Sequence, residues 1–385
     1  MGKRGQGEGS IFQRSDGRWC GLLSLGWEGG RRKRKYFYGA TAAEVQEQLL
    51  RARSDHSQGL QVLTERQTLE HFLQEWLERS LKVRAKPRAH ESFSTIVRLH
   101  IVPMLGKVQL AKLQPQHVQR LLDDKSKQGL SPQTVTNIRT VLRSALAQAQ
   151  KWGLTPRNVA ALVDAPRIHR MQIRPLDPEN SRKLIDAAKA SRFEAVYITA
   201  LTLGLRRGEV LGVRWCDVDF DSRTLRVNQS IQRLLTGAES GPKSALRATD
   251  TKTDGSRRTI AIPDSVVRAL RLQRARQAQE RLAAGSSWYD HDLIFTNQSG
   301  GPLEPKVLAR DYKTLLKKAG LPTTLRFHDL RHSAATLLLA QGVHPRAIME
   351  LLGLSSITVT MNTYGHVLPA MMRNAADKMD AILGS

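Results

Sequence analysis

A group of prolines in the middle of the chain limits how it can fold, because it divides the sequence into separate parts. Four prolines lie between residues 153 and 178, around a basic run that ends at Arg170. A proline ring fixes φ and removes a backbone donor, so prolines at this spacing resist both a helix and a central strand. We therefore predict an extended linker over residues 161–178, whose positive charge suits it to crossing a phosphate backbone. A last domain over residues 179–385 follows it.

The chain also carries a large excess of positive charge. Its 60 Lys and Arg residues outnumber 35 Asp and Glu residues, which gives a net charge of +25. Such an excess costs self-repulsion and usually has a polyanionic partner, with nucleic acid the first candidate and an anionic membrane the second. No apolar run approaches the ~18 residues that a membrane span needs, and the first ten residues lack the apolar core of a signal peptide. Cys20 and Cys216 are too far apart to indicate a disulfide framework or a metal site. These features predict a cytoplasmic protein that binds nucleic acid and uses no metal.

Residues 1–60 have the pattern of a small domain with three strands and a helix. Strand candidates cover residues 10–14, 19–27 and 31–38, and Thr41 with Glu44 forms a capping box that starts a helix. We expect a core in which strand residues pack on the helix. The expected core residues are Leu22, Leu25, Val45 and Leu49. The other face of the sheet would present basic residues to a DNA groove, or would form a solvated basic hairpin. The basic residues concerned are Arg14, Arg18, Arg32 and Arg34.

Residues 65–160 change to a helical period, which predicts a bundle of four helices. The second of these helices is expected to end before Pro103, and the fourth to begin with Ser131 as N-cap and Pro132 at its first position. Arg139 and Arg143 are basic residues on the fourth helix that are suited to clasping DNA. The alternative is that they belong to an ordinary solvated face.

The last domain mixes helices with a few strands. Asp177 is the expected N-cap of its first helix, and strands are predicted over residues 224–232 and 258–263, separated by a loose polar insertion. Further helices are predicted over residues 264–284, 305–318, 329–341 and 345–351. The fold class of the whole chain is therefore mainly α with small β-sheets.

A compact cluster near the end of the chain suggests chemistry on phosphate. His328 and Arg331 are three positions apart, so they share a face of a helix. Arginine suits both free oxygens of a phosphate, and the hydroxyl of Tyr364 is a possible nucleophile. A surface helix that happens to carry these residues is the alternative. His332, beside them, is expected to be structural.

Four separated pieces of sequence occur in an order that identifies a family. They are TLGLRRGEVLGVRWCDVD around Arg206, TKTDGSRR around Lys252, HDLRH from His328, and LGLSSITVTMNTYGHV through Tyr364. Together they resemble the tyrosine recombinases, the phage-integrase family. The resemblance implies an arm-binding-like N-terminal domain, a helical core-binding (SAM-like) domain and a mixed α/β, mostly helical catalytic domain. It also implies a C-shaped clamp on double-stranded DNA that acts as a homotetramer.

By this resemblance, Arg206 and Arg331 hold the non-bridging oxygens of the scissile phosphate. His328 hydrogen-bonds the phosphate or takes the tyrosine proton, Lys252 protonates the departing 5′ oxygen, and Tyr364 attacks to leave a 3′-phosphotyrosyl link. Glu209, one turn from Arg206, is expected to orient that arginine. No metal, ATP or other cofactor is implied.

One position departs from the family pattern. The stretch that usually reads Leu-Gly-His-Ser-Ser before the nucleophile is Leu-Gly-Leu-Ser-Ser here, with Leu354 in place of the histidine or, in some members, tryptophan. Leucine cannot donate a hydrogen bond, and loss of one such donor costs roughly ten- to a thousandfold in rate. Three explanations are open: tolerance of the loss, a deliberate substitution, or replacement by another donor such as His366.

The resemblance implies an integrase that integrates or excises a phage or other mobile element in the nucleoid of a bacterial host. Its expected DNA targets are attachment sites with separate core and arm sequences. Accessory DNA-bending or directionality proteins are further expected partners. A type IB topoisomerase uses the same residue types, although the separate arm-like and core-like domains argue against it. A recombinase-like DNA-binding protein with impaired catalysis is the other alternative, because of Leu354.

Overall fold

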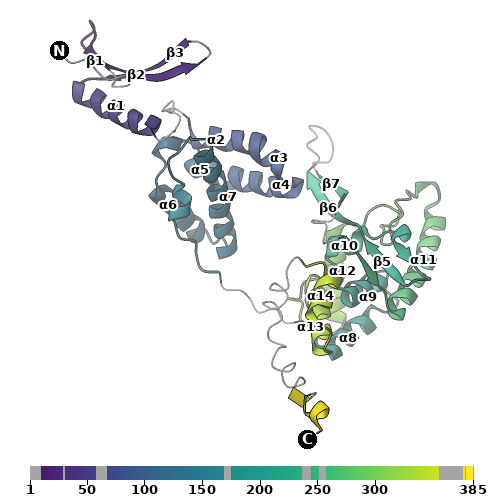
Figure 1. Ribbon diagram of the computed structural model, residues 1–385. Helices are drawn as coiled ribbons and strands as arrows, with labels where there is room; N and C mark the ends of the chain where they lie inside the picture. Colours follow the sequence, from purple (N-terminus) through teal and green to yellow (C-terminus); the bar gives the residue numbers. More distant parts are fainter. Residues whose placement is uncertain are drawn as a thin grey trace. The chain divides into compact units, whose positions relative to one another are not determined.

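The computed structural model describes residues 10–28, 31–57, 67–168, 175–235, 244–250, 257–354, 376–377 and 379–384. The chain divides into two compact units, residues 1–170 and 171–385 (Figure 1). The expected fold class is confirmed: helices dominate, and the sheets are small and antiparallel. Within the described ranges, every helix is too short or too polar to cross a lipid bilayer.

The N-terminal part of the first unit is a three-stranded sheet covered by one helix. Strands β1 (Ser10–Gln13), β2 (Trp19–Glu28) and β3 (Arg31–Gly39) pair in that order, and α1 (Ala42–Ser57) follows. The Thr41 hydroxyl accepts from the Glu44 N–H at 3.3 Å, as a capping box requires. The Glu44 carboxylate accepts from the N–H of Ala40 at 2.9 Å, so the return bond reaches one residue before the cap.

The sheet face that packs on α1 differs from the expected one. Leu23 is buried with Val45 and Leu49, whereas Leu22 is only half-buried. Gly21 explains why this face packs on α1, because a Cβ at that position would lie 2.6 Å from Val45 Cγ1 and 2.7 Å from Leu49 Cδ1. The helix approaches the sheet where no side chain stands, and strand alternation then directs Leu23 inward with Gly21. The side chain of Leu25 lies outside the described residues.

The rest of the first unit is a bundle of helices with its own core. Its longer elements are α2 (Leu69–Glu75) with η1 (Trp76–Leu81) and α3 (Lys82–Arg84), α4 (Pro87–Ile96) with η2 (Val97–Ile101) and α5 (Val102–Leu105), α6 (Pro115–Lys127) and α7 (Pro132–Lys151). Two short 3₁₀ turns, η3 (Leu110–Lys112) and η4 (Val159–Leu162), complete it. Ser131 caps α7 as expected, accepting from the Thr134 N–H at 3.2 Å.

The helix of residues 87–105 passes through Pro103, where it was expected to stop. The preceding turn, η2, is a π-helix, in which the N–H of Val102 bonds the carbonyl of Val97. A wider turn just before the proline re-sets the hydrogen-bond ladder, so the missing proline donor does not end the helix.

The second unit surrounds a buried helix with other helices and two small sheets. Its helices are α8 (Pro178–Ala188), α9 (Glu194–Leu203), α10 (Arg207–Gly212), α11 (Asp264–Ala284), α12 (Pro305–Lys318), α13 (Asp329–Ala340) and α14 (Pro345–Leu352), with 3₁₀ turns η5 (Trp215–Asp217) and η7 (Gly285–Ser287). Its strands are β4 (Val218–Asp219), β5 (Thr224–Val227), β6 (Gln229–Leu235), β7 (Ser244–Asp250) and β8 (Arg258–Ala261). Asp177 caps α8 as expected, accepting from the Asn180 N–H at 2.7 Å.

The strands of this unit correct two expectations. The predicted strand over residues 224–232 is two strands that break at Asn228 and join different sheets, β4-β5-β8 and β6-β7. Part of the expected loose insertion is β7, which pairs with β6 along its whole length. A strand whose partner is its own hairpin neighbour needs little apolar alternation, so the polar sequence of β7 did not indicate it.

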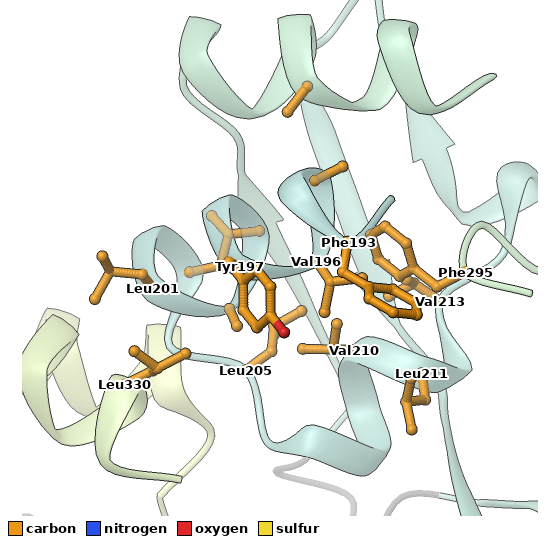
Figure 2. Packing of buried hydrophobic residues seen from close by; sticks show 14 of the residues in the cluster. Phe193, Val196, Tyr197, Leu201, Leu205, Val210, Leu211, Val213, Phe295 and Leu330 are labelled. Carbon is orange, nitrogen blue, oxygen red and sulfur yellow. The ribbon is translucent and has the colours of Figure 1, made fainter. Parts of the chain in front are cut away.

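Helix α9 forms the centre of this unit. It is apolar on nearly all sides, and Val196, Tyr197 and Leu201 pack among residues of α10, α13 and the Phe295 loop (Figure 2). A helix that is apolar all round belongs in a core. Because α9 is enclosed, the residues that follow its C-terminus have a defined position.

Candidate active site

The loop between α9 and α10 is shaped by Gly204. This glycine ends α9 with φ of +60°, in the left-handed region that favours glycine. A Cβ here would overlap Leu352 of α14 and lie 3.3 Å from Ala334 of α13. Gly204 therefore lets the end of α9 pack closely against α13 and against the end of α14, and Arg206 follows two residues later.

Arg206 is held by the helix that it precedes. Its Nη1 donates to Glu209 Oε1 at 2.6 Å, and its backbone N–H donates to Glu209 Oε2 at 3.1 Å. Its Nη2 donates to the carbonyl of Gly353 at 3.0 Å. The side chain remains 38% exposed, so part of the guanidinium faces solvent. Glu209 therefore binds Arg206 through both of its carboxylate oxygens, and its role in orienting that arginine stays a prediction.

A second arginine, Arg258 of β8, binds the same carboxylate. Its Nη2 donates to Glu209 Oε2 at 3.0 Å, and both side chains are buried. Burial favours the neutral carboxyl, but the two guanidinium groups outweigh it, Arg258 most strongly, so the pKa of Glu209 is lowered. Glu209 is therefore a buried anion that joins two cations.

Arg331 and His328 reach the same region from α13. Arg331 is buried, and its Nη1 donates to the carbonyl of Gly204 at 2.9 Å. His328 occupies the N-cap position of α13 with an exposed side chain, and its ring meets that of His332 edge-on at 5.2 Å. His328 and Arg331 were expected to share a helix face. They differ in burial, because the side chain of Arg331 lies inside and that of His328 lies at the surface.

The imidazole of His328 resists protonation. Desolvation by its neighbours, followed by the charges of His332, Arg331 and Arg206, lowers its pKa to about 4. His328 is therefore neutral at neutral pH, so its ring has one nitrogen able to accept a proton. The pKa of His332 is also lowered, mainly by burial.

Leu354 belongs to a small apolar cluster. It is half-buried and packs with Ala335, Leu339, Ile348 and Leu352, which lie on α13 and α14. Its backbone N–H donates to the carbonyl of Met349 at 3.0 Å, which continues the C-cap of α14. Leu354 therefore helps to join α13 to α14, at the position where the resemblance predicts a donor.

Three of the expected site residues lie outside the described residues. They are Lys252, Tyr364 and Arg170. Their roles remain predictions. Arg206, Glu209, His328 and Arg331, by contrast, are all described, and they lie together around the ends of α9, α13 and α14.

The expected DNA-binding arginines fall into two groups. Arg14, Arg18, Arg34 and Arg143 are exposed, and Arg14 lies over the ring of Tyr38 at 5.7 Å. Arg139 instead donates to the carbonyl of Ala161 at 3.5 Å, where it links α7 to η4. The side chain of Arg32 lies outside the described residues.

Arg258 is the residue of this network that sequence reasoning missed. A signal was present: Arg258 pairs with Val227 and is two positions from Ile260, so it stands on the buried face of its strand. A charged residue at an inward position requires a buried partner.

The arrangement can hold a dianionic or monoanionic phosphate. Two arginines supply donors that match phosphate oxygens, and a neutral imidazole beside them can accept or share a proton. The residues come from three separated segments, so the site exists only in the folded unit.

Comparison with known proteins identifies the family. Residues 174–371 match the phage integrase family, and residues 68–126 match the phage integrase N-terminal SAM-like domain. An integrase of Saccharopolyspora erythraea is 28% identical over 97% of this chain and 96% of its own. The Tn1549 transposon integrase in complex with transposon right end DNA is 20% identical with a TM-score of 0.67, covering 80% of this chain and 99% of its own. A lambda integrase tetramer bound to a Holliday junction is 17% identical with a TM-score of 0.57, covering 90% of this chain and 96% of its own. The matched segments, taken with the convergence of Arg206, His328 and Arg331, mean that this chain belongs to the phage integrase family of tyrosine recombinases.

Proposed function

We propose that the chain is a site-specific recombinase that cleaves and rejoins DNA through a 3′-phosphotyrosyl intermediate, and so integrates or excises a mobile element. One observation carries the proposal. Arg331 donates to the carbonyl of Gly204, Arg206 follows that glycine by two residues, and both charges act on a neutral His328, although more than 120 residues separate the two arginines in the chain. Such a cluster of fixed donors suits the charge that develops on a phosphodiester under attack.

The proposed reaction exchanges one phosphodiester for another. The Tyr364 oxygen attacks phosphorus in line, the bond to the 5′ oxygen breaks, and a 3′-phosphotyrosyl bond forms. Arg206 and Arg331 stabilise the non-bridging oxygens, and Glu209 keeps Arg206 in place. His328 accepts or shares the tyrosine proton, and Lys252 gives a proton to the departing 5′ oxygen. A free 5′ hydroxyl later attacks the phosphotyrosine and releases the tyrosine, so the bond energy is conserved.

The proposed substrate is double-stranded DNA, and the proposed active form is a homotetramer on it. The net charge of +25 supports a polyanionic partner, and the tetramer follows the lambda integrase to which the chain is similar. The face of the N-terminal sheet away from α1 suits a separate arm site, because exposed Arg34, Tyr36 and Tyr38 alternate along β3. Core attachment sites would then be held by the other domains, with accessory DNA-bending or directionality proteins, in the nucleoid of a bacterial cytoplasm.

Leu354 supports a second candidate, a recombinase-like DNA-binding protein with impaired catalysis. Its side chain packs in the α13–α14 cluster and cannot donate to a phosphate. We favour the recombinase with a reduced rate, since the other expected residues of the described site are present.

A covalent-adduct assay separates the candidates. The protein is incubated with nicked duplexes that carry its attachment site, and protein–DNA adducts are resolved under denaturing conditions. The recombinase forms an adduct that Tyr364→Phe abolishes and that proceeds to strand exchange. Tyr289→Phe is the matched control, because Tyr289 is 69% exposed in the same unit and outside the site. Binding without an adduct would favour the impaired regulator, and relaxation of supercoils without site preference would favour a topoisomerase.

A further inference from the structure

Arg258 is a buried arginine to which the reaction above gives no role, and it touches two parts of the candidate active site. It is the first residue of β8 and stands six positions after Lys252 in the sequence. Its side chain is 8% exposed. Nη2 donates to Glu209 Oε2 at 3.0 Å, and Nε donates to the carbonyl of Leu351 at 2.6 Å.

The first contact connects Arg258 to Arg206. The Glu209 carboxylate receives Arg206 Nη1 on one oxygen at 2.6 Å and Arg258 Nη2 on the other at 3.0 Å. A carboxylate that is buried between two guanidinium groups has little freedom to rotate. Displacement of Arg258 would therefore move Glu209, and with it the guanidinium of Arg206.

The second contact connects Arg258 to the end of α14. The last carbonyls of a helix carry partial negative charge and need partners. Arg258 donates a hydrogen bond to the carbonyl of Leu351, and Arg206 donates one to the carbonyl of Gly353 at 3.0 Å. The Arg258 guanidinium also lies close against Gly353, where a Cβ would come within 2.8 Å of Nη1. Both arginines thus hold the residues from which the chain continues through Leu354 to Tyr364.

We propose that Arg258 is a positioning residue for strand cleavage. Through Glu209 it sets the orientation of Arg206, and through Leu351 it holds the end of α14 that leads to the nucleophile. The proposal rests on the function proposed above, and it requires no contact between Arg258 and DNA.

The geometry requires an arginine. Two of its bonds leave a planar fork toward acceptors on different elements, Glu209 of α10 and Leu351 of α14. A lysine keeps the positive charge but offers one ammonium group, which cannot reproduce both bonds in that fork. Arg258→Lys therefore preserves charge and removes orientation.

The test compares Arg258→Lys and Arg258→Gln with the wild type and with Arg226→Gln. Arg226 is a matched control because it is exposed on the neighbouring strand β5. Single-turnover cleavage of a nicked duplex is measured with DNA at saturation, and the Kd for DNA is measured separately. We expect both Arg258 variants to cleave about 10- to 100-fold more slowly, by analogy with the loss seen when the outer-shell partners of metal ligands are removed. Their Kd should change less than about threefold, since the loss falls on the chemical step. Arg226→Gln should behave as the wild type.

A double variant tests the route through Glu209. If Arg258 acts by holding that carboxylate, Glu209→Gln combined with Arg258→Gln cleaves no more slowly than the slower single variant. Multiplied losses would mean that the two residues act independently, and would overturn the proposal. A residue that served only general stability would not produce this pattern.

Folding is controlled by thermal unfolding of each variant, with cleavage measured well below every transition. Should Arg258→Gln fail to fold, Arg258→Lys decides the matter, because it keeps a buried cation beside Glu209. Wild-type cleavage by Arg258→Lys overturns the inference and leaves the proposed function standing. A wild-type chain that forms no adduct dependent on Tyr364 overturns the proposed function, and this inference with it.

Discussion

A buried carboxylate is costly unless opposite charges surround it, and Glu209 has the guanidinium groups of Arg206 and Arg258 on its two oxygens. Neither arginine is a near neighbour of the other in sequence. Arg206 keeps part of its side chain at the surface, whereas Arg258 is buried. Arg258 therefore neutralises the Glu209 carboxylate in the interior, whereas Arg206 can also bind a substrate at the surface.

The neutral state of His328 gives a prediction for stability. Its pKa in the folded chain, about 4, lies below its ordinary value of 6.5, so the unfolded chain takes up a proton first as pH falls. The contribution of His328 to folding is thus fully present above pH 6.5 and is lost as pH falls toward 4. Urea unfolding at pH 7 and pH 5 should show a larger loss of stability in the wild type than in His328→Gln. His291→Gln, at an exposed position, should keep the wild-type loss. Equal losses in the wild type and His328→Gln would contradict the prediction.

Leu354 gives a prediction for rate. Leu354→His restores a donor at the family position, and we expect faster cleavage of a nicked duplex, by up to the roughly ten- to thousandfold that one such donor contributes. Leu354→Phe is the control, since it keeps an apolar side chain and adds no donor. The histidine should also cost about 1 kcal/mol of stability, because Leu354 packs in the α13–α14 cluster. No gain in the single-turnover rate would count against a missing donor.

Among the elements, α9 and the turn that ends it determine where the site forms. The helix is enclosed by apolar neighbours, so its C-terminus is fixed, and the carbonyl of Gly204 receives the buried Arg331. Helices α13 and α14 approach that turn closely because no Cβ stands there. The site therefore depends on packing between elements as much as on its charged residues.

Two glycines separate the effect of packing from that of backbone conformation. Gly204 and Gly320 both end helices with positive φ, +60° and +66°, but a Cβ at Gly320 would meet nothing within 4 Å. Gly320→Ala should cost about 1–2 kcal/mol for the left-handed conformation alone. Gly204→Ala should cost about 1–3 kcal/mol more, because its Cβ overlaps Leu352. Denaturant midpoints at constant m report both values. Equal costs would show that the space around Gly204 can accept a Cβ without a clash.

At the scale of the whole molecule, charge is the dominant feature. The net charge of +25 is much larger than the number of cations paired in the candidate active site, and many of the arginines are exposed. The exposed Arg34 shares its sheet face with Tyr36 and Tyr38. On this face an arginine could contact the DNA phosphate backbone beside two aromatic rings.

This excess charge predicts steep salt dependence of DNA binding. If six to ten phosphates are neutralised, affinity should fall about 10³- to 10⁵-fold between 50 and 200 mM salt, since binding releases counterions. Arg34→Gln should reduce the slope of log K against log salt by about one. Arg223→Gln is the control, because that exposed arginine is paired with Asp264 at 2.7 Å. A shallow slope for the wild type would indicate that few phosphates are contacted.

The sequence alone determined the features that depend on short-range bonds and on residue type. Ser131 and Asp177 cap their helices with side chains that reach three residues ahead, so neighbouring residues suffice to predict them. The sequence also predicted Arg206, Glu209, His328 and Arg331 as site residues, because the order and residue types of their motifs resemble those of a family.

Tertiary structure decided the features that depend on distant partners. The sheet face that holds Leu23 follows from the approach of α1 to Gly21, and the break at Asn228 follows from two different partner strands. The role of Arg258 follows from Glu209 and Leu351, which lie 49 and 93 residues away in the chain. Packing and buried charge depend on which segments meet in space, and local sequence carries only indirect signs of that, such as an arginine on the inward face of a strand.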